Sequence, residues 1–313
     1  MNLLATIAAT TLVGASLLGA APLAAAHLGP LVTPSELNAE LADLDPVLLD
    51  IRVGVYEKGH VEGAVYAPYS IFRGPDNNPG QVPPLAKLEA SFEQIGLETD
   101  RPIVIIAQGD TDTDFGAAAR VYWTLKSTGF TELSILNGGT TAWANAGLPI
   151  STATETLMPT DLSLNWDDRW TAETPAVRGI VDGKSRAVLV DARPPAFYKG
   201  KSAHGAAARP GTLPRAENLP YTQFFRPGAT VIDRQVDAAA LKAKLGIADG
   251  EEVVSFCNTG HWAATEWFAL SELAGIENVK LYPGSMVEYS ATDGAMENQP
   301  GLLRNLLNQL TGG

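Results

Sequence analysis

The sequence has little cysteine and little positive charge, and both shortages exclude classes of protein. Among its 313 residues, Cys257 is the only cysteine, which excludes an internal disulfide and any zinc or iron–sulfur site built on several cysteines. Lys and Arg number 22 against 35 Asp and Glu, so nucleic acid, which needs a basic face, is not an expected partner. Hydrophobic residues make up 45%, enough to form packed cores, and the length predicts two domains.

The first 26 residues lack charged side chains altogether. Residues 1–26 are rich in Leu, Ala, Val and Ile, and they end in Ala24-Ala25-Ala26, a pattern typical of a signal-peptidase site. We therefore expect a signal peptide cleaved after Ala26 and a periplasmic or secreted protein without stable membrane insertion. The alternative is an uncleaved anchor, because about 20 apolar residues can span a bilayer. The two glycines and one proline of this segment make it a poor anchor.

Residues 30–150 predict one α/β domain, in which strands alternate with helices. The segment Thr33-Pro34-Ser35-Glu36 is a capping box with proline at the first helical position, so a short helix is expected to follow. Continuous apolar runs predict buried parallel strands, and periodic apolar residues predict helices. The strands are expected at 46–52, 103–106 and 133–136, and further helices at 85–95, at 117–126 and around Trp143. This alternation implies a small doubly wound parallel sheet flanked by helices.

Residues 172–292 repeat the pattern of the first domain. The matching segments are 188–193 with 48–52, 211–220 with 59–68, 253–256 with 103–106, and 281–289 with 136–143. Residues 151–171 carry none of these landmarks and are interpreted as a linker, and residues 293–313 as a C-terminal tail. The second copy also has an insertion at 199–210. The chain is therefore predicted to be a duplicated α/β domain.

The repeated motifs resemble those of the rhodanese family. They are Asp-x-Arg after a buried strand, Gly-His-x-x-Gly-Ala-x-x-x-Pro from Gly59, a Leu-x-Gly-Gly turn before Trp143, and a cysteine loop after a central strand. The resemblance covers nearly all of residues 30–292. It implies two rhodanese-like domains in a sulfurtransferase of the thiosulfate or mercaptopyruvate type. It also implies a small sulfur-containing donor, a thiophilic acceptor (cyanide, a thiol or a protein) and no cofactor.

Cys257 falls where a predicted strand ends and a predicted helix begins, and open α/β sheets place their sites there. The helix N-terminus favours negative charge, hence a thiolate nucleophile or a persulfide. Backbone N–H groups of the following residues are expected to surround the sulfur as an anion-binding loop. These residues are Asn258, Thr259, Gly260, His261 and Trp262. The first copy runs into Ala107 at the matching position, so it is expected to be inactive and to form a wall of the cleft.

Other interpretations use the same cysteine. A buried structural cysteine is common. A phosphatase of related fold needs an arginine six positions after the cysteine, where Ala263 stands. A hydrolase needs a separate histidine base, whereas His261 lies within the loop. The rival from another class is a non-catalytic carrier of sulfane sulfur or a partner-binding module.

The cations of the thiosulfate-type pattern are missing from their usual places. Thr259 stands two residues after the cysteine, and Phe197 stands beside Tyr198, where the pattern has an arginine. Arg193 of the second Asp-x-Arg is a structural ion pair or a substrate contact. Other cations are expected from the insertion and its flank, namely Lys199, Lys201, His204, Arg209 and Arg215. The histidines show no ligand spacing, so no metal is expected.

Overall fold

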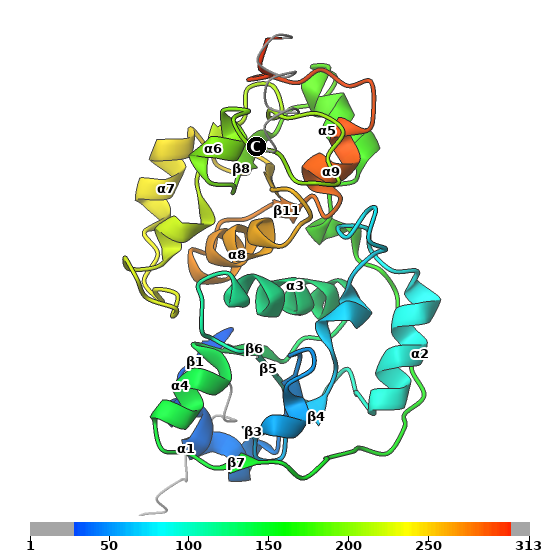
Figure 1. Cartoon of the computed structure of the whole chain (residues 1–313), viewed down its shortest axis with the longest axis vertical. Helices are drawn as coiled ribbons and strands as arrows, with labels where there is room; N and C mark the ends of the chain where they lie inside the picture. The colour runs from blue at the N-terminus through cyan, green and yellow to red at the C-terminus, as the bar shows by residue number, and fades with distance from the viewer. Residues whose placement is uncertain (1–27, 302–313) are drawn as a thin grey trace, which may run out of the picture.

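The computed structural model describes residues 28–301, which form two parallel sheets, one in each half of the sequence (Figure 1). The first sheet has the strand order β1-β6-β5-β2-β4 and the second the order β11-β10-β8-β9. Every neighbouring pair in both sheets is parallel. The predicted duplicated α/β fold is confirmed. The predicted signal peptide, its cleavage site and residues 302–313 lie outside the described residues.

The four-residue strands lie where the apolar runs predict them. The first domain contains β1 (Leu31–Val32), β2 (Val47–Asp50), β4 (Val65–Tyr66), β5 (Ile103–Ile106) and β6 (Leu133–Leu136). It also contains an antiparallel pair of β3 (His60–Val61) and β7 (Ile150–Ser151). The second domain contains β8 (Val188–Asp191), β9 (Glu217–Asn218), β10 (Val253–Phe256) and β11 (Val279–Leu281). The central strands β5 and β10 are buried throughout, as strands covered on both faces must be.

Helices cover the faces of both sheets. Those of the first domain are α1 (Pro34–Leu44), α2 (Leu85–Ile95), α3 (Asp114–Ser127) and α4 (Gly139–Asn145). Those of the second are α5 (Thr174–Val181), α6 (Pro195–Tyr198), α7 (Ala238–Leu245), α8 (Trp262–Phe268) and α9 (Ser285–Ser290). The predicted capping box of α1 is confirmed. Helix α3 begins three residues before the predicted Ala117, because the Asp114 carboxylate accepts the N–H groups of Asp110 and Thr111 and fixes the loop to the helix start.

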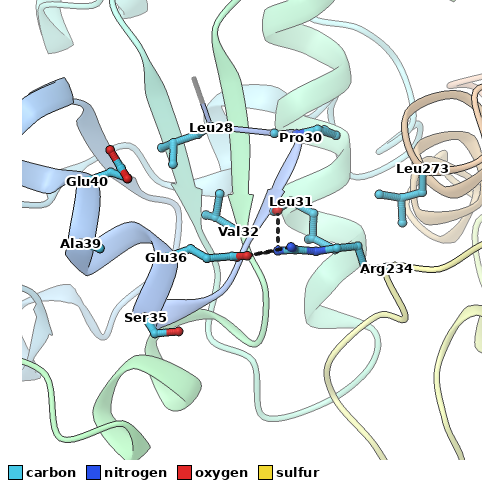
Figure 2. Close-up of a pocket in the computed structure, with 11 residues that line it drawn as sticks. Leu28, Pro30, Leu31, Val32, Ser35, Glu36, Ala39, Glu40, Arg234 and Leu273 are labelled. Carbon is cyan, nitrogen blue, oxygen red and sulfur yellow. Dashed lines mark hydrogen bonds and ion pairs between the residues drawn. The ribbon is translucent and has the colours of Figure 1, made fainter. Parts of the chain in front are cut away.

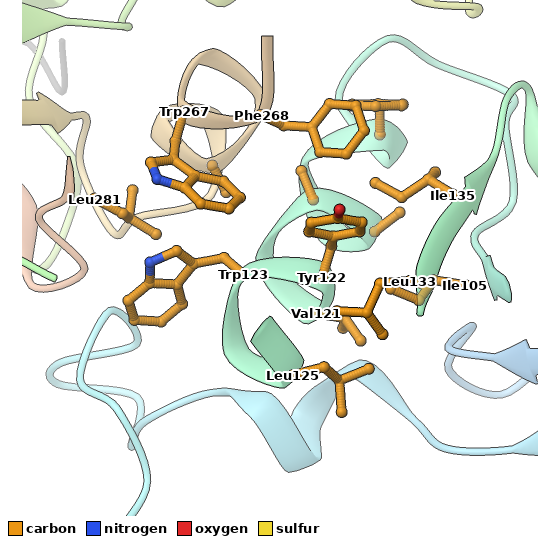
Figure 3. Close-up of a cluster of buried hydrophobic side chains, with 14 of the residues drawn as sticks. Ile105, Val121, Tyr122, Trp123, Leu125, Leu133, Ile135, Trp267, Phe268 and Leu281 are labelled. Carbon is orange, nitrogen blue, oxygen red and sulfur yellow. The ribbon is translucent and has the colours of Figure 1, made fainter. Parts of the chain in front are cut away.

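The two domains share one hydrophobic core. Figure 1 shows α3 and α8 side by side across the middle of the molecule, between the two sheets. Figure 3 shows Tyr122 and Trp123 of α3 facing Trp267 and Phe268 of α8. The rings of Tyr122 and Phe268 meet edge to face, with centroids 5.1 Å apart, and all four side chains are buried. Because these aromatic contacts are buried, they fix how one domain sits against the other.

Connecting segments also join the domains. Linker residues Leu162 and Leu164 donate backbone N–H groups to the carboxylates of Glu93 and Glu89 on α2. From the second domain, Arg234 reaches back to the Glu36 carboxylate, 2.6 Å away, and to the Leu31 carbonyl oxygen (Figure 2). A cavity of about 590 Å³ lies beside this ion pair, and the Cys257 loop does not line it. No helix within residues 28–301 is long and apolar enough to cross a membrane.

Candidate active site

Cys257 follows directly on the central strand β10, which lies between β8 and β11. The loop 257–261 leads from this strand into α8, which begins at Trp262. Only 1% of the Cys257 residue surface is exposed. Gly260 has φ +66°, and a Cβ there would meet the Arg120 guanidinium and lie 2.6 Å from the Pro283 carbonyl oxygen. The loop therefore closes tightly over the cysteine only because residue 260 has no side chain.

Ser285 holds two N–H groups of this loop. Its Oγ accepts the Cys257 N–H at 3.0 Å and the Gly260 N–H at 3.2 Å, and it donates to the Tyr282 carbonyl oxygen at 2.8 Å. The Gly260 N–H is thus not a free donor toward the sulfur, which corrects the predicted role of that residue. Ser285 was missed from the sequence, although its place in the repeat, opposite Gly139, marked the turn on which it lies.

Four loop residues keep backbone donors free. Within residues 28–301 the backbone N–H groups of Asn258, Thr259, His261 and Trp262 make no hydrogen bond. Buried N–H groups without a partner are costly and rare. A set of them around one cysteine is the arrangement that an anionic sulfur or oxyanion would satisfy.

Arg193 stabilises the cysteine loop through the side chain of Asn258. It is 2% exposed, and its Nη2 lies 2.6 Å from the Asp191 carboxylate and 2.9 Å from the Gly211 carbonyl oxygen. Its Nη1 donates to Asn258 Oδ1 at 3.3 Å. Of the two roles considered for Arg193, the structure thus supports the ion pair, and the guanidinium acts by holding the Asn258 side chain.

The first domain supplies the cations that the cysteine loop lacks. Arg73, which follows the 3₁₀ turn Tyr69–Phe72, donates from Nη1 to the Thr259 carbonyl oxygen at 2.9 Å. Arg120 of α3 is fully buried and points Nη1 toward the Gly260 carbonyl oxygen, 3.5 Å away. Neither arginine has a carboxylate partner within residues 28–301. These contacts could not be predicted from the sequence, because Arg73 lies 186 residues from Thr259 along the chain.

His261 and Trp262 are bound to the first domain. The His261 Nε2 lies 2.8 Å from the Thr113 carbonyl oxygen, which only accepts, so Nε2 carries the proton and Nδ1 accepts from the Tyr69 hydroxyl at 2.9 Å. Burial and the nearby charge of Arg73 lower the pKa of His261 to about 4. The Trp262 Nε1 donates to Thr113 Oγ1 at 2.9 Å. With both nitrogens occupied and no charge near neutral pH, His261 is not placed to act as a base.

A neutral carboxyl lies below the loop. Ser255 Oγ is 3.0 Å from the Ala263 carbonyl oxygen and 2.5 Å from Glu266 Oε2. One hydroxyl proton cannot serve both, and the carbonyl cannot donate, so the Glu266 carboxyl carries a proton and donates to Ser255. Complete burial raises the pKa of Glu266 well above its usual value, in agreement with this arrangement. Glu266 therefore brings no negative charge near Cys257.

The cations of the insertion and its flank have different fates. Arg209 donates to carbonyl oxygens of Ser290, Thr292 and Gly294, and Arg215 to those of Ile180 and Val181. These two arginines support the fold, which corrects the expectation that they add charge to the site. Lys199 and Lys201 are exposed. His204 is half-buried, and this burial together with the charge of Arg73 lowers the pKa of its imidazole.

Aromatic rings cover the start of α8. Phe197 packs edge-on against Trp262, with ring centroids 5.9 Å apart, and Tyr221 stacks on the same indole at 5.2 Å. Phe197 thus occupies the place of the expected arginine and helps fix the loop. In the part of the chain that the structure describes, no group of three or more His, Cys, Asp or Glu side chains is placed to hold a metal ion.

The comparisons with known proteins agree with this architecture. A sequence model described as "Rhodanese-like domain" matches residues 33–146 and 176–292. A "Putative thiosulfate sulfurtransferase" of Synechococcus elongatus is 26% identical over 86% of this chain and 85% of its own length. The "Sulfur carrier protein TtuD" of Thermus thermophilus is 27% identical over 63% of this chain and 71% of its own.

Solved structures share the fold. The 3-mercaptopyruvate sulfotransferase SseA of Escherichia coli superposes with a TM-score of 0.68 at 22% identity, covering 82% of this chain and 99% of that one. Because the two matches of the family model together cover well over half of the 313 residues, the chain belongs to the rhodanese family.

Proposed function

We propose that the protein is a sulfurtransferase that carries sulfane sulfur on Cys257 as a persulfide. The observation that carries the proposal is the set of free N–H donors around a single buried cysteine at the carboxyl end of β10. The printed names of the relatives, a thiosulfate sulfurtransferase and a sulfur carrier, point to the same chemistry.

The transfer takes place in two displacements. The Cys257 thiolate attacks the outer sulfur of a donor such as thiosulfate, a new S–S bond forms, and sulfite leaves with the electron pair of the old one. The persulfide anion then gives its outer sulfur to a thiophilic acceptor, for example cyanide, which leaves as thiocyanate and restores the thiolate. Neither displacement moves a proton. A site in which His261 is neutral and engaged by Tyr69 and Thr113 suits this reaction and does not suit hydrolysis.

A mass measurement tests the proposal. Purified protein incubated with thiosulfate should gain the mass of one sulfur atom, and cyanide should remove it. The variant Cys257→Ser should gain nothing while keeping its melting temperature, because serine replaces a buried side chain of similar size. A sulfur adduct on Cys257→Ser, or none on the wild type with any donor tried, would contradict the proposal.

The carrier function is the second candidate. The near-complete burial of Cys257 favours it, because a buried sulfur is protected from small acceptors. Stoichiometric persulfide formation without repeated turnover on cyanide, but with transfer to a protein thiol, would assign the protein as a carrier. Steady thiocyanate production would assign it as an enzyme.

We also propose that the protein is exported and cleaved after Ala26. The proposal rests on the uncharged apolar segment 1–26 and its final small residues. N-terminal sequencing of the protein from its native host should begin at His27. Material that begins at Met1 and stays with the membrane would support the anchor instead.

A further inference from the structure

We propose that Arg73 of the first domain forms the subsite for the anionic end of the sulfur donor. The inference rests on the proposed sulfurtransferase function and deepens it. The donor class is a small molecule whose transferable sulfur is attached to an anionic group, a sulfonate or a carboxylate.

The guanidinium of Arg73 is fixed in position beside the cysteine loop. Its Nη1 is fixed by the Thr259 carbonyl oxygen at 2.9 Å, and its guanidinium lies over the Tyr69 ring, 5.3 Å from the centroid. Within residues 28–301 no carboxylate pairs with it, and it also hydrogen-bonds to the Tyr69 side chain. Arg73 is half-buried, so its positive charge is not simply a solvated surface charge.

The surrounding charges favour an anion. Arg120 is fully buried without a carboxylate partner, and its Nε has no hydrogen bond. Burial and the charge of Arg73 lower the pKa of Arg120 only to about 9, so it remains charged at neutral pH. Two unpaired arginines thus stand beside the loop of a protein whose formal net charge is −13. Such a local field attracts anions into an otherwise acidic molecule.

The subsite explains how the protein manages without cations at Thr259 and Phe197. With the outer sulfur of thiosulfate at Cys257, the oxygens of the sulfonate meet the guanidinium of Arg73. A carboxylate on a mercapto-acid donor would meet the same group. The positive charge comes from the domain that carries no cysteine.

Steady-state kinetics with thiosulfate and, separately, with 3-mercaptopyruvate test the subsite. Arg73→Gln should raise KM for the preferred donor about 10-fold or more while kcat changes less than about threefold, and Arg73→Lys should restore part of the loss. The matched control is Arg101→Gln, which removes the same charge from the first domain at the amino end of β5, where Arg101 pairs with Asp45. It should behave as wild type.

A second measurement separates binding from loop structure. Persulfide loading by inorganic polysulfide, which lacks a sulfonate or carboxylate, should be nearly unchanged in Arg73→Gln. If polysulfide loading falls as much as thiosulfate turnover, Arg73 only supports the loop and the subsite is wrong. Equal KM values for Arg73→Gln and Arg101→Gln would also overturn it. A wild type that forms no persulfide with any donor would instead refute the proposed function, so the two failures are distinguishable.

Discussion

The two domains share the same arrangement of strands and helices, but only the second carries a nucleophile. In the second domain Arg193 joins the Asp191 carboxylate to the Asn258 side chain. In the first, Arg52 pairs with Asp50 at 2.7 Å and donates to Gln108 Oε1 at 3.0 Å. The residue that precedes the amide side chain is Cys257 in one domain and Ala107 in the other. The arginine–aspartate ion pair that holds the loop is therefore present even in the domain without a cysteine. This ion pair supports the fold independently of any chemistry at the loop.

In each domain a turn faces the loop after the central strand, and the two turns differ by one hydroxyl group, that of Ser285. The backbone N–H of Thr140 donates to the Ala107 carbonyl oxygen at 2.9 Å, and the backbone N–H of Met286 donates to the Cys257 carbonyl oxygen at 3.0 Å. The residue before each donor has positive φ, +56° at Gly139 and +51° at Ser285. Glycine adopts this conformation freely, whereas serine is strained in it. The second domain accepts the strain and gains an Oγ that ties two N–H groups of the cysteine loop.

The first domain has kept a supporting role. The residues that precede α3 and α8, Thr113 and His261, correspond in the repeat and are hydrogen-bonded to each other. Arg73 and Tyr69 of the first domain also contact the Cys257 loop. The domain without a nucleophile therefore stabilises the cysteine loop of the other domain.

The largest expected effect comes from moving the nucleophile. Cys257→Ala should lower sulfur transfer at least about 10³-fold, because no other thiol exists in the chain. Adding Ala107→Cys to that variant should not restore activity, since the first loop faces Gly139 and lacks the serine hydroxyl. Thiocyanate production measures both. Recovery of more than a few per cent of the wild-type activity would show that the fold shared by the two domains is enough to make a cysteine reactive.

A second test measures how much the absence of a side chain at Gly260 contributes to stability. Gly260 and Gly246 have nearly the same φ, +66° and +67°, but a Cβ at Gly246 meets nothing within 4 Å. Gly246→Ala should cost about 1 kcal/mol from the backbone conformation alone. Gly260→Ala should cost about 3 kcal/mol or more, because the methyl group also overlaps the Pro283 carbonyl oxygen and the Arg120 guanidinium. Urea unfolding measures both, and equal losses would refute the argument from packing.

The third test uses the pH dependence of stability. The folded-state pKa of His261 is about 4, below the ordinary value of 6.5, so the unfolded chain takes up the proton first as the pH falls. Stability should therefore be lost between pH 6.5 and pH 4, by up to about 3 kcal/mol from this residue. His261→Gln can donate to Thr113 and accept from Tyr69 without titrating. The difference between wild type and this variant across that range isolates the histidine, and parallel curves would contradict the assigned neutral state.

Local patterns in the sequence were enough to predict most of the fold. Strands β5, β6 and β10 coincide with the predicted apolar runs, because buried parallel strands need continuous apolar residues. The two-residue strand β1 was not predicted, since Leu31 and Val32 carry no pattern by themselves and pair only because β6 is beside them. Helix α3 begins earlier than the sequence predicts, because its first turn is fixed by the Asp114 carboxylate rather than by apolar periodicity.

The site was only half visible in the sequence. Cys257 and its loop could be predicted because strand, turn and helix follow one another along the chain. Arg73, Thr113 and Ser285 could not, because each reaches the loop from a distant segment, and Arg73 stands in an unremarkable stretch rich in Gly, Pro and Asn. The packing of α3 on α8, which brings Arg73 and Thr113 to the Cys257 loop, is a property of the folded pair of domains.

The smallest effect distinguishes the serine hydroxyl from the strain of its backbone. Ser285→Ala should destabilise the protein by about 2 kcal/mol, because the buried N–H groups of Cys257 and Gly260 lose their acceptor. Ser285→Gly loses the same acceptor but relieves the positive φ, so it should be about 1 kcal/mol more stable than the alanine variant. In the first domain Gly139→Ser should be destabilising, because its Cβ would lie 2.8 Å from the Ala107 carbonyl carbon and the hydroxyl has no loop to tie. Urea unfolding of the three variants gives the order, and an alanine variant at least as stable as the glycine variant would show that Ser285 bears no strain.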